Sequence, residues 1–127
     1  MATEPSQVWF AQYQSLYQAF DPAVADMYCD EAVIQNKRTY PDGNQRTVNL
    51  PAAAYKNLLR SVMPVAKAKG DVSTYTDVNY SAEGANVRIK AMRYSEMKRY
   101  ESPLSLLVGR CADGKRGILE ELSHSRP

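Results

Sequence analysis

The sequence predicts an α+β domain with its helices in the first half of the chain and most of its strands in the second half. Apolar side chains recur at steps of three and four between residues 5 and 20, as on an amphipathic helix. Apolar and polar residues alternate from Asn86 to Ala91, as on a strand with one buried face. Short turns separate several such segments, so successive strands should pair antiparallel.

Length and composition predict one domain over residues 1–127. The chain is 44% hydrophobic and 24% charged, which is ordinary for a globular protein. No apolar run approaches the roughly 18 residues of a membrane helix, and the net charge of +2 attracts neither nucleic acid nor lipid strongly. Cys29 and Cys111 are too few for a disulfide framework. We therefore expect a cytoplasmic protein with reduced cysteines and no membrane association.

Three helices are predicted before residue 70. The first spans about residues 5–20. Asp21 and Pro22 begin a second, short helix, because Asp accepts hydrogen bonds from free first-turn amides and Pro fits the first helical position. A third helix follows Pro51. Pro64 lies inside its pattern and lacks an amide donor, so we expect a kink or an irregular exit there.

The strands are predicted by β-branched and aromatic residues between turn sequences. The turn Pro41-Asp42-Gly43-Asn44 should join residues 32–40 and 45–48 into a hairpin. Further strands are predicted over residues 72–80, 86–97, 104–111 and 118–124.

This order of elements resembles the nuclear transport factor 2-like (NTF2-like) superfamily, which includes SnoaL-like and ketosteroid-isomerase-like proteins. The most specific match is Met27-Tyr28-Cys29-Asp30-Glu31-Ala32-Val33-Ile34, where a helix passes through an acidic pair into a strand. Asp113-Gly114-Lys115, Glu120-Glu121 and the Ser-His-Ser-Arg-Pro ending are also similar to SnoaL-like members. The resemblance implies a strongly curved antiparallel or mixed sheet around the helices (a cystatin-like cone), a pocket open at one end, and a homodimer formed through the sheet.

The resemblance also bears on chemistry. Ketosteroid isomerases use a carboxylate base just after this motif and a tyrosine on the first helix that stabilises an oxyanion. Tyr13 lies at the matching place on the helix, but the base position falls on Asn36, whose amide is not basic. Asn36 can still form hydrogen bonds with a polar ligand. The sequence therefore assigns no catalytic residue.

Six residues are candidates for binding a ligand: Tyr13, Tyr17, Asn36, Tyr55, Arg93 and Glu120. The three tyrosines lie on buried helix faces, where they either pack in the core or line a cavity. Arg93 continues the inward parity of its strand, unless a bulge returns it to solvent. Glu120 shares a face with Ile118, which places it at pocket depth and in reach of Arg93 as an ion-pair partner.

Metal, cofactor and nucleic-acid functions find little support. His124, the only histidine, could act as an acid or base near the pocket rim. One histidine and two distant cysteines have no metal-ligand spacing, so we expect neither a metal nor a cofactor. Basic and aromatic residues interleave over 88–100, but Glu96 and Glu101 interrupt them. Alternating charges of this kind are more typical of a solvated sheet face than of a nucleic-acid surface.

We therefore hypothesise a small-molecule-binding, SnoaL-like protein whose ligand is a metabolite with polar and apolar parts. If it is an enzyme, we expect acid–base chemistry of the isomerase, dehydratase or hydrolase type. The alternative is a non-catalytic dimeric interaction module, which Asn36 at the base position favours. Fold alone does not decide between them.

Overall fold

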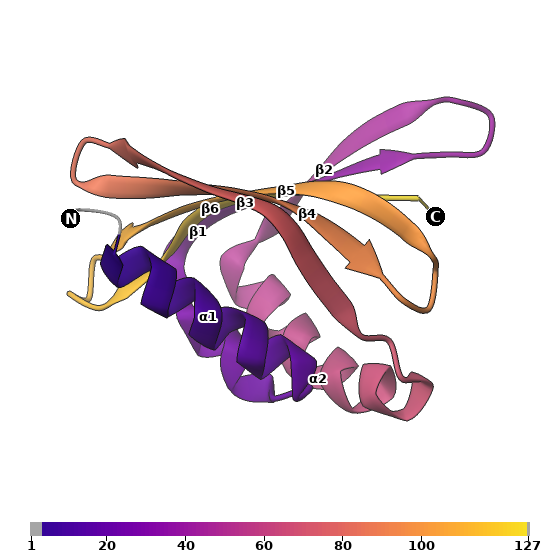
Figure 1. Ribbon diagram of the computed structural model, residues 1–127, viewed down its shortest axis with the longest axis horizontal. Helices are drawn as coiled ribbons and strands as arrows, with labels where there is room; N and C mark the ends of the chain where they lie inside the picture. Colours follow the sequence, from indigo (N-terminus) through magenta and orange to yellow (C-terminus); the bar gives the residue numbers. More distant parts are fainter. Residues whose placement is uncertain (1–3, 127) are drawn as a thin grey trace.

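One curved six-stranded sheet carries all the helices on its concave side (Figure 1). The computed structural model describes residues 4–126; residues 1–3 and 127, the predicted ends of the domain, lie outside this range. The strands are β1 (Tyr28–Thr39), β2 (Gln45–Pro51), β3 (Ser73–Glu83), β4 (Asn86–Ser95), β5 (Tyr100–Arg110) and β6 (Arg116–Ser125). Their order is β2-β1-β6-β5-β4-β3, with β1 and β6 parallel and all other neighbours antiparallel. The α+β prediction with a mixed sheet is confirmed.

The helical elements are α1 (Glu4–Gln18), the 3₁₀ helix η1 (Pro22–Met27) and α2 (Ala52–Lys69). The predicted start of the second element is confirmed, because the Asp21 carboxylate accepts a hydrogen bond from the Ala23 amide at 2.9 Å and Pro22 follows the cap. Gly70 ends α2 in the left-handed conformation, with φ of 68°. Glycine adopts this conformation without steric cost, so it suits a helix end.

The expected irregular exit at Pro64 is wrong, because α2 continues through Pro64 to Lys69. Proline in a helix frees the carbonyl four residues earlier, which here belongs to Arg60. Both residues lie on the exposed side of α2. Water can therefore satisfy the freed carbonyl, and the helix tolerates the proline.

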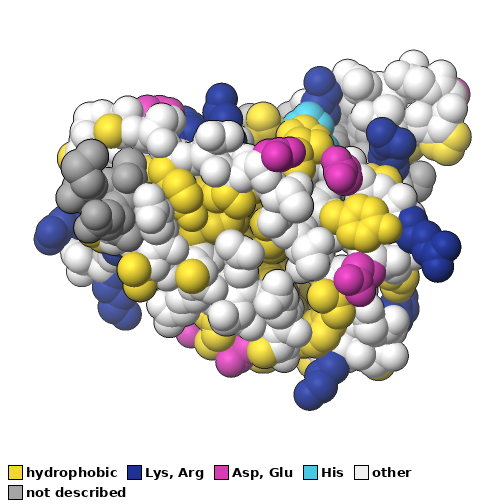
Figure 2. All heavy atoms as spheres, in the orientation of Figure 1, with side chains coloured by type: hydrophobic (Ala, Val, Ile, Leu, Met, Phe, Trp, Pro, Cys, Tyr) yellow, Lys and Arg dark blue, Asp and Glu magenta, His cyan; other side chains and the backbone are white. Residues whose placement is uncertain are grey.

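The hydrophobic core fills one end of the concave face, which we call the closed end. Phe10, Val24, Leu106, Val108 and Ile118 are completely inaccessible to solvent there. They come from α1, η1 and the two central strands β5 and β6, so burial of these side chains fastens the helices to the middle of the sheet. Figure 2 shows hydrophobic side chains along the seam between the helices and the sheet.

A disulfide joins Cys29 to Cys111 at the closed end, so the expectation of two reduced cysteines is wrong. The two residues are 82 positions apart, but Cys29 lies near the start of β1 and Cys111 follows β5, with 5.2 Å between their Cα atoms. Both side chains are buried. Disulfides form mainly in oxidising compartments, so this bond weighs against a reduced setting. The cytoplasmic location stays a prediction.

The hairpin of β1 and β2 projects beyond the remaining strands (Figure 1). Its turn places Gly43 at φ of 87°, and the Asp42 carboxylate accepts a hydrogen bond from the Asn44 amide at 2.9 Å. The predicted hairpin is thus confirmed, with β2 extended to Pro51. Within residues 4–126, none of the helices has the length and apolar character needed to cross a bilayer.

Candidate functional site

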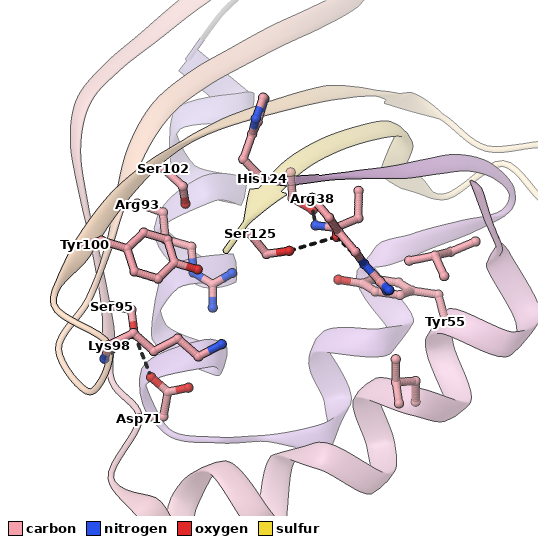
Figure 3. Close-up of a pocket in the computed structure, with 14 residues that line it drawn as sticks. Arg38, Tyr55, Asp71, Arg93, Ser95, Lys98, Tyr100, Ser102, His124 and Ser125 are labelled. Carbon is pink, nitrogen blue, oxygen red and sulfur yellow. Dashed lines mark hydrogen bonds between the residues drawn. The ribbon is translucent and has the colours of Figure 1, made fainter. Parts of the chain in front are cut away.

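A two-lobed hollow opens on the concave face at the end opposite the core, which we call the open end. The first lobe, the basic lobe, has a volume of about 250 Å³. We define it by Arg38, Asp71, Arg93, Lys98, Tyr100 and Ser125. Figure 3 shows the guanidinium of Arg93, the amino group of Lys98 and the hydroxyl of Tyr100 directed into this space. These side chains come from β4, the β4–β5 turn and β5, elements that lie together only in the folded sheet.

Positive charge dominates the basic lobe. Of the residues that the structure describes, three cations line it, and Asp71 is the one carboxylate. Asp71 is engaged by Ser95, whose hydroxyl donates to Oδ1 at 3.1 Å. The Arg93 Nε donates to the Ser73 hydroxyl at 3.0 Å. Among the described residues neither Arg93 nor Lys98 forms an ion pair. Both charges are therefore available to an anion that enters the lobe.

Asn36 forms one wall of the basic lobe within a polar network. Its Nδ2 donates to the Ser123 hydroxyl at 3.0 Å, and its Oδ1 accepts from the Ser125 hydroxyl at 3.0 Å and from the Arg38 Nε at 3.1 Å. The network fixes the position of Arg38 and leaves the outer nitrogens of the guanidinium to the hollow. Asn36 thus contributes to the site by holding the side chain of Arg38 in position.

The apolar lobe has a volume of about 350 Å³ and lies between α1, α2 and the β4–β5 turn. We define it by Phe20, Leu59, Val62, Met63, Ala66 and Met97. Four residues line both lobes: Tyr55, Asp71, Arg93 and Lys98. The two lobes are therefore neighbouring parts of one hollow, with a pair of cations at their junction.

A buried carboxylate lies behind the hollow. Glu121 is only 4% exposed, and the Tyr28 hydroxyl donates to its Oε1 at 2.5 Å. The Tyr17 hydroxyl lies 3.4 Å from that of Tyr28. Burial raises the pKa of Glu121, against the opposing effects of hydrogen bonds from Tyr28 and Tyr55 and the charge of Arg93. Burial, and next the Glu121 charge, raise the pKa of Tyr17, so its hydroxyl stays protonated at neutral pH.

Comparisons with known proteins identify the architecture. No protein-family model and no curated protein sequence matches the chain. An NTF2-like protein of unknown function from Shewanella oneidensis is 12% identical, with a TM-score of 0.65 over 98% of this chain and 100% of that one. An NTF2-like protein with a cystatin-like fold from Novosphingobium aromaticivorans is 14% identical, with a TM-score of 0.55 over 91% and 75%. A protein from Catenulispora acidiphila in complex with S-DNPA is 12% identical, with a TM-score of 0.58 over 94% and 89%.

The chain has the NTF2-like fold. At these identities the likeness is one of architecture, and it confirms the fold that the order of helices and strands predicts. A shared fold does not fix a function, which depends on the residues of the site.

Within the NTF2-like fold, four of the six candidate residues line the hollow. Tyr17 lines the apolar lobe, Asn36 the basic lobe, and Tyr55 and Arg93 both. Arg93 keeps the inward parity of β4, because its pairing with β5 has no bulge. Tyr13 lies in the core instead. Its side chain is 2% exposed, and its ring centroid is 4.8 Å from that of Tyr17.

The predicted position of Glu120 in the pocket is wrong. Its side chain is 50% exposed on the outer face of the sheet and lies 3.7 Å from the Arg88 guanidinium. The reason is a bulge at Leu119, because Ile118 pairs with Val108 and Glu120 with Leu107, which leaves one extra residue in β6. The extra residue reverses the parity of the strand. Glu121 therefore takes the inward position that alternation assigns to Glu120.

The basic stretch over 88–100 is divided between the two faces of the sheet. Arg88 and Lys90 face outward, whereas Arg93 and Lys98 line the hollow. The division leaves no continuous basic surface along this stretch. His124 borders the basic lobe and also the groove on the outer face, but its ring points away from the hollow (Figure 3). Burial together with the charge of Lys37 lowers its pKa.

Potential metal ligands meet at the closed end, a cluster that the sequence spacing did not indicate. Ligand atoms of Cys29, Glu31 and Cys111 lie within 4.8 Å of one another. The two sulfurs are bonded to each other, and the Glu31 carboxylate accepts a hydrogen bond from the Ala112 amide at 2.6 Å. A disulfide offers no thiolate to a metal. We assign no metal site to this cluster.

Proposed function

We propose that the protein binds a small organic anion in the basic lobe. The observation that carries this proposal is that Arg38, Arg93 and Lys98 line one hollow, in which Asp71 is the one carboxylate among residues 4–126 (Figure 3). Arg38 and Arg93 are half-buried, and among the described residues the side-chain hydrogen bond of each is made by its Nε, to Asn36 and to Ser73. Charged groups held partly away from water are costly unless they are paired, and an organic anion would pair with the outer nitrogens of the guanidinium groups.

The donors around the lobe suit a carboxylate. A guanidinium presents two parallel N–H donors that match the two oxygens of a carboxylate, and charged hydrogen bonds of this kind are stronger than neutral ones. Lys98 adds a second charge, and the hydroxyl of Tyr100, which accepts a hydrogen bond from the Arg126 amide, has its own proton left to donate in the same hollow. The protein from Catenulispora acidiphila, solved in complex with S-DNPA, is a precedent for a ligand complex in this fold.

We propose binding without a catalytic residue. Neither Glu121 nor Tyr28 lines a lobe, so a proton from Glu121 would reach a ligand only through a tyrosine hydroxyl such as that of Tyr17 or Tyr55. Asn36, at the position of the ketosteroid-isomerase base, accepts two hydrogen bonds at Oδ1 and donates one from Nδ2 to its neighbours, and its amide is not basic. The geometry therefore supports recognition of an anion more directly than acid–base chemistry.

The test is a calorimetric titration with hexanoate, and with hexanamide as its neutral counterpart. We expect hexanoate to bind more tightly, and Arg93→Gln and Lys98→Gln each to weaken it roughly 10- to 100-fold, the effect of one charged hydrogen bond. Lys90→Gln is the matched control, because Lys90 lies on the same strand and faces outward. Equal affinities for acid and amide, or equal losses in Lys90→Gln, would contradict the proposal.

A second candidate, the dimeric interaction module, is favoured by the outer face of the sheet. A groove of about 380 Å³ there is lined by Met92, Pro103 and Leu122, among others. Leu122 and Val33 are 37% and 57% exposed on this face. Apolar exposure of this kind marks many contact surfaces, and we propose a two-fold homodimer through it.

Sedimentation velocity tests the dimer. Leu122→Glu should convert a dimer into monomers, because it places a charge in the centre of the contact. Val8→Glu is the control, since Val8 is 73% exposed on α1, away from the groove. A wild-type chain that stays monomeric at every concentration, or a dimer that Leu122→Glu leaves intact, would rule out this surface.

A further inference from the structure

The apolar side chains of the apolar lobe do not hold an anionic group. The lobe nevertheless lies directly beside the basic lobe, which does. Arg93 and Lys98 line both lobes, so their charges stand at the junction between a polar and an apolar space. A molecule anchored there by its anionic group has apolar walls on one side. The structure therefore restricts the shape of the ligand as well as its charge.

We propose that the ligand is an amphipathic monocarboxylate, with its carboxylate at Arg93 and Lys98 and its apolar chain in the apolar lobe. The inference rests on the proposed anion binding and adds the class of ligand. A singly charged group fits the junction because Asp71 also lines it and repels additional negative charge.

Apolar side chains at the mouth of the lobe remain partly in water. Val65 is 53% exposed and Met97 is 43% exposed, and both line the lobe together with Met63, which is buried at its base. Covering such side chains with an apolar chain removes their surface from water, which favours binding roughly in proportion to the area covered. Methionine also adapts its shape to chains of different form.

A homologous series of unbranched carboxylates tests the inference. We expect affinity, measured by calorimetry, to rise from butanoate to decanoate by roughly two- to fourfold for each added methylene, the upper value corresponding to about 0.8 kcal/mol. The n-alcohols of equal length, which lack the charge, should bind more weakly at every length. The gain in affinity per methylene measures the contribution of the apolar lobe. The difference between each carboxylate and the alcohol of equal length measures the contribution of the cations.

Two variants at the edges of the apolar lobe test whether the gain in affinity per methylene arises there. Val62→Asn and Met97→Gln should each reduce the gain per methylene, because a polar side chain in the lobe favours contact with an apolar chain less than Val or Met does. Val8→Asn is the matched control on an exposed part of α1 that lines neither lobe, and it should not change the series. Thermal unfolding of each variant verifies that the fold is retained.

The outcomes separate the two proposals. Carboxylates that all bind with one affinity would overturn the amphipathic ligand and leave anion binding intact. Alcohols that bind as tightly as carboxylates would overturn anion binding itself. If the gain in affinity per methylene persists undiminished in both lobe variants, the alkyl chain of the ligand binds elsewhere, and the inference is overturned.

Discussion

The closed and open ends of the concave face are built from the same strands and differ in what fills them. At the closed end the inward residues of β5 and β6 are Leu106, Val108 and Ile118, all without solvent exposure. At the open end the inward residues of those strands include Ser102 on β5 and Ser123 and Ser125 on β6. Tyr100 of β5 directs its hydroxyl into the same space (Figure 3). Apolar side chains fill the first end, and serine side chains leave space at the second.

The difference indicates a division of labour. Burial and covalent bonding at the closed end stabilise the fold, whereas the cations at the open end add little to stability and are free to bind. Changes at the closed end should therefore lower the free energy of unfolding with little effect on ligand affinity. Changes at the open end should lower ligand affinity with little effect on the free energy of unfolding. The expected losses of stability decrease from the disulfide at the closed end to Lys98 at the open end.

Removal of the disulfide should be the most destabilising change. The double variant Cys29→Ala, Cys111→Ala should lose about 2–5 kcal/mol of unfolding free energy, because the bond closes a long loop of chain. Urea denaturation measures this loss. Hexanoate affinity of the folded variant should stay within about twofold of the wild type. A large loss of affinity without loss of stability would connect the two ends and contradict the separation.

Gly117→Ala should destabilise the closed end by about 1–3 kcal/mol. A Cβ atom at Gly117 would lie 2.8 Å from the Cys111 sulfur and 2.9 Å from the Met27 carbonyl oxygen, contacts that require the backbone to move. Gly114→Ala controls for the loss of a glycine in open space, since a Cβ atom at Gly114 would have no neighbour within 4 Å, although its φ of 90° adds turn strain. A denaturation midpoint unchanged in Gly117→Ala would show that the packing here is loose.

Glu121→Gln should raise stability in a pH-dependent way. Burial raises the pKa of Glu121 in the folded chain, so the folded state holds this proton to higher pH than the unfolded state does. Stability therefore falls as the pH rises from the unfolded pKa, about 4.3, toward the folded one, and stays lower above it. Gln keeps an oxygen to accept the Tyr28 hydrogen bond and has no charge to bury.

Denaturation at several values from about pH 4, near the unfolded pKa of a glutamate, up to about pH 8 measures this difference in stability. The advantage of Glu121→Gln over the wild type should grow with pH. Glu120→Gln is the matched control one residue away, exposed beside Arg88, and should differ from the wild type by less than about 1 kcal/mol at any pH. Equal pH profiles for the two variants would contradict the assignment of Glu121 as the buried carboxylate.

Lys98→Gln should have the smallest effect on stability, within about 0.5 kcal/mol, because Lys98 is exposed and makes no ion pair among the described residues. Thermal unfolding without ligand measures this. With hexanoate added, the variant should show a smaller rise in midpoint than the wild type, since ligand stabilisation follows affinity. If hexanoate raised the unfolding midpoint of the variant and of the wild type equally, Lys98 would not belong to the site.

Much of the fold could be predicted from local pattern. The spacing of apolar residues in α1 and the turn chemistry around Gly43 and Gly114 are properties of neighbouring residues, and they indicate the elements and most of their order. The position of Arg93 on the inner face also followed from alternation. The disulfide did not, because contact between Cys29 and Cys111 depends on the order of strands across the sheet.

The site was predicted only in part, for a physical reason at β6. Its inward residues after the bulge are Glu121, Ser123 and Ser125, so the strand has no apolar alternation there to reveal its parity. The extra residue at Leu119 then reverses the face of every residue that follows. Lys98 was missed because it lies in a turn, where strand parity gives no direction.

The most direct test of the separation between the two ends is an amide chemical-shift map of the chain titrated with octanoate. We predict that the shifts that change most belong to Arg93, Lys98 and Val62, at the junction and in the apolar lobe. The signals of Phe10 and Ile118 at the closed end should stay in place. Changes centred on the closed end or on Leu122 of the outer face, or no saturable change at all, would contradict an anion site at the open end.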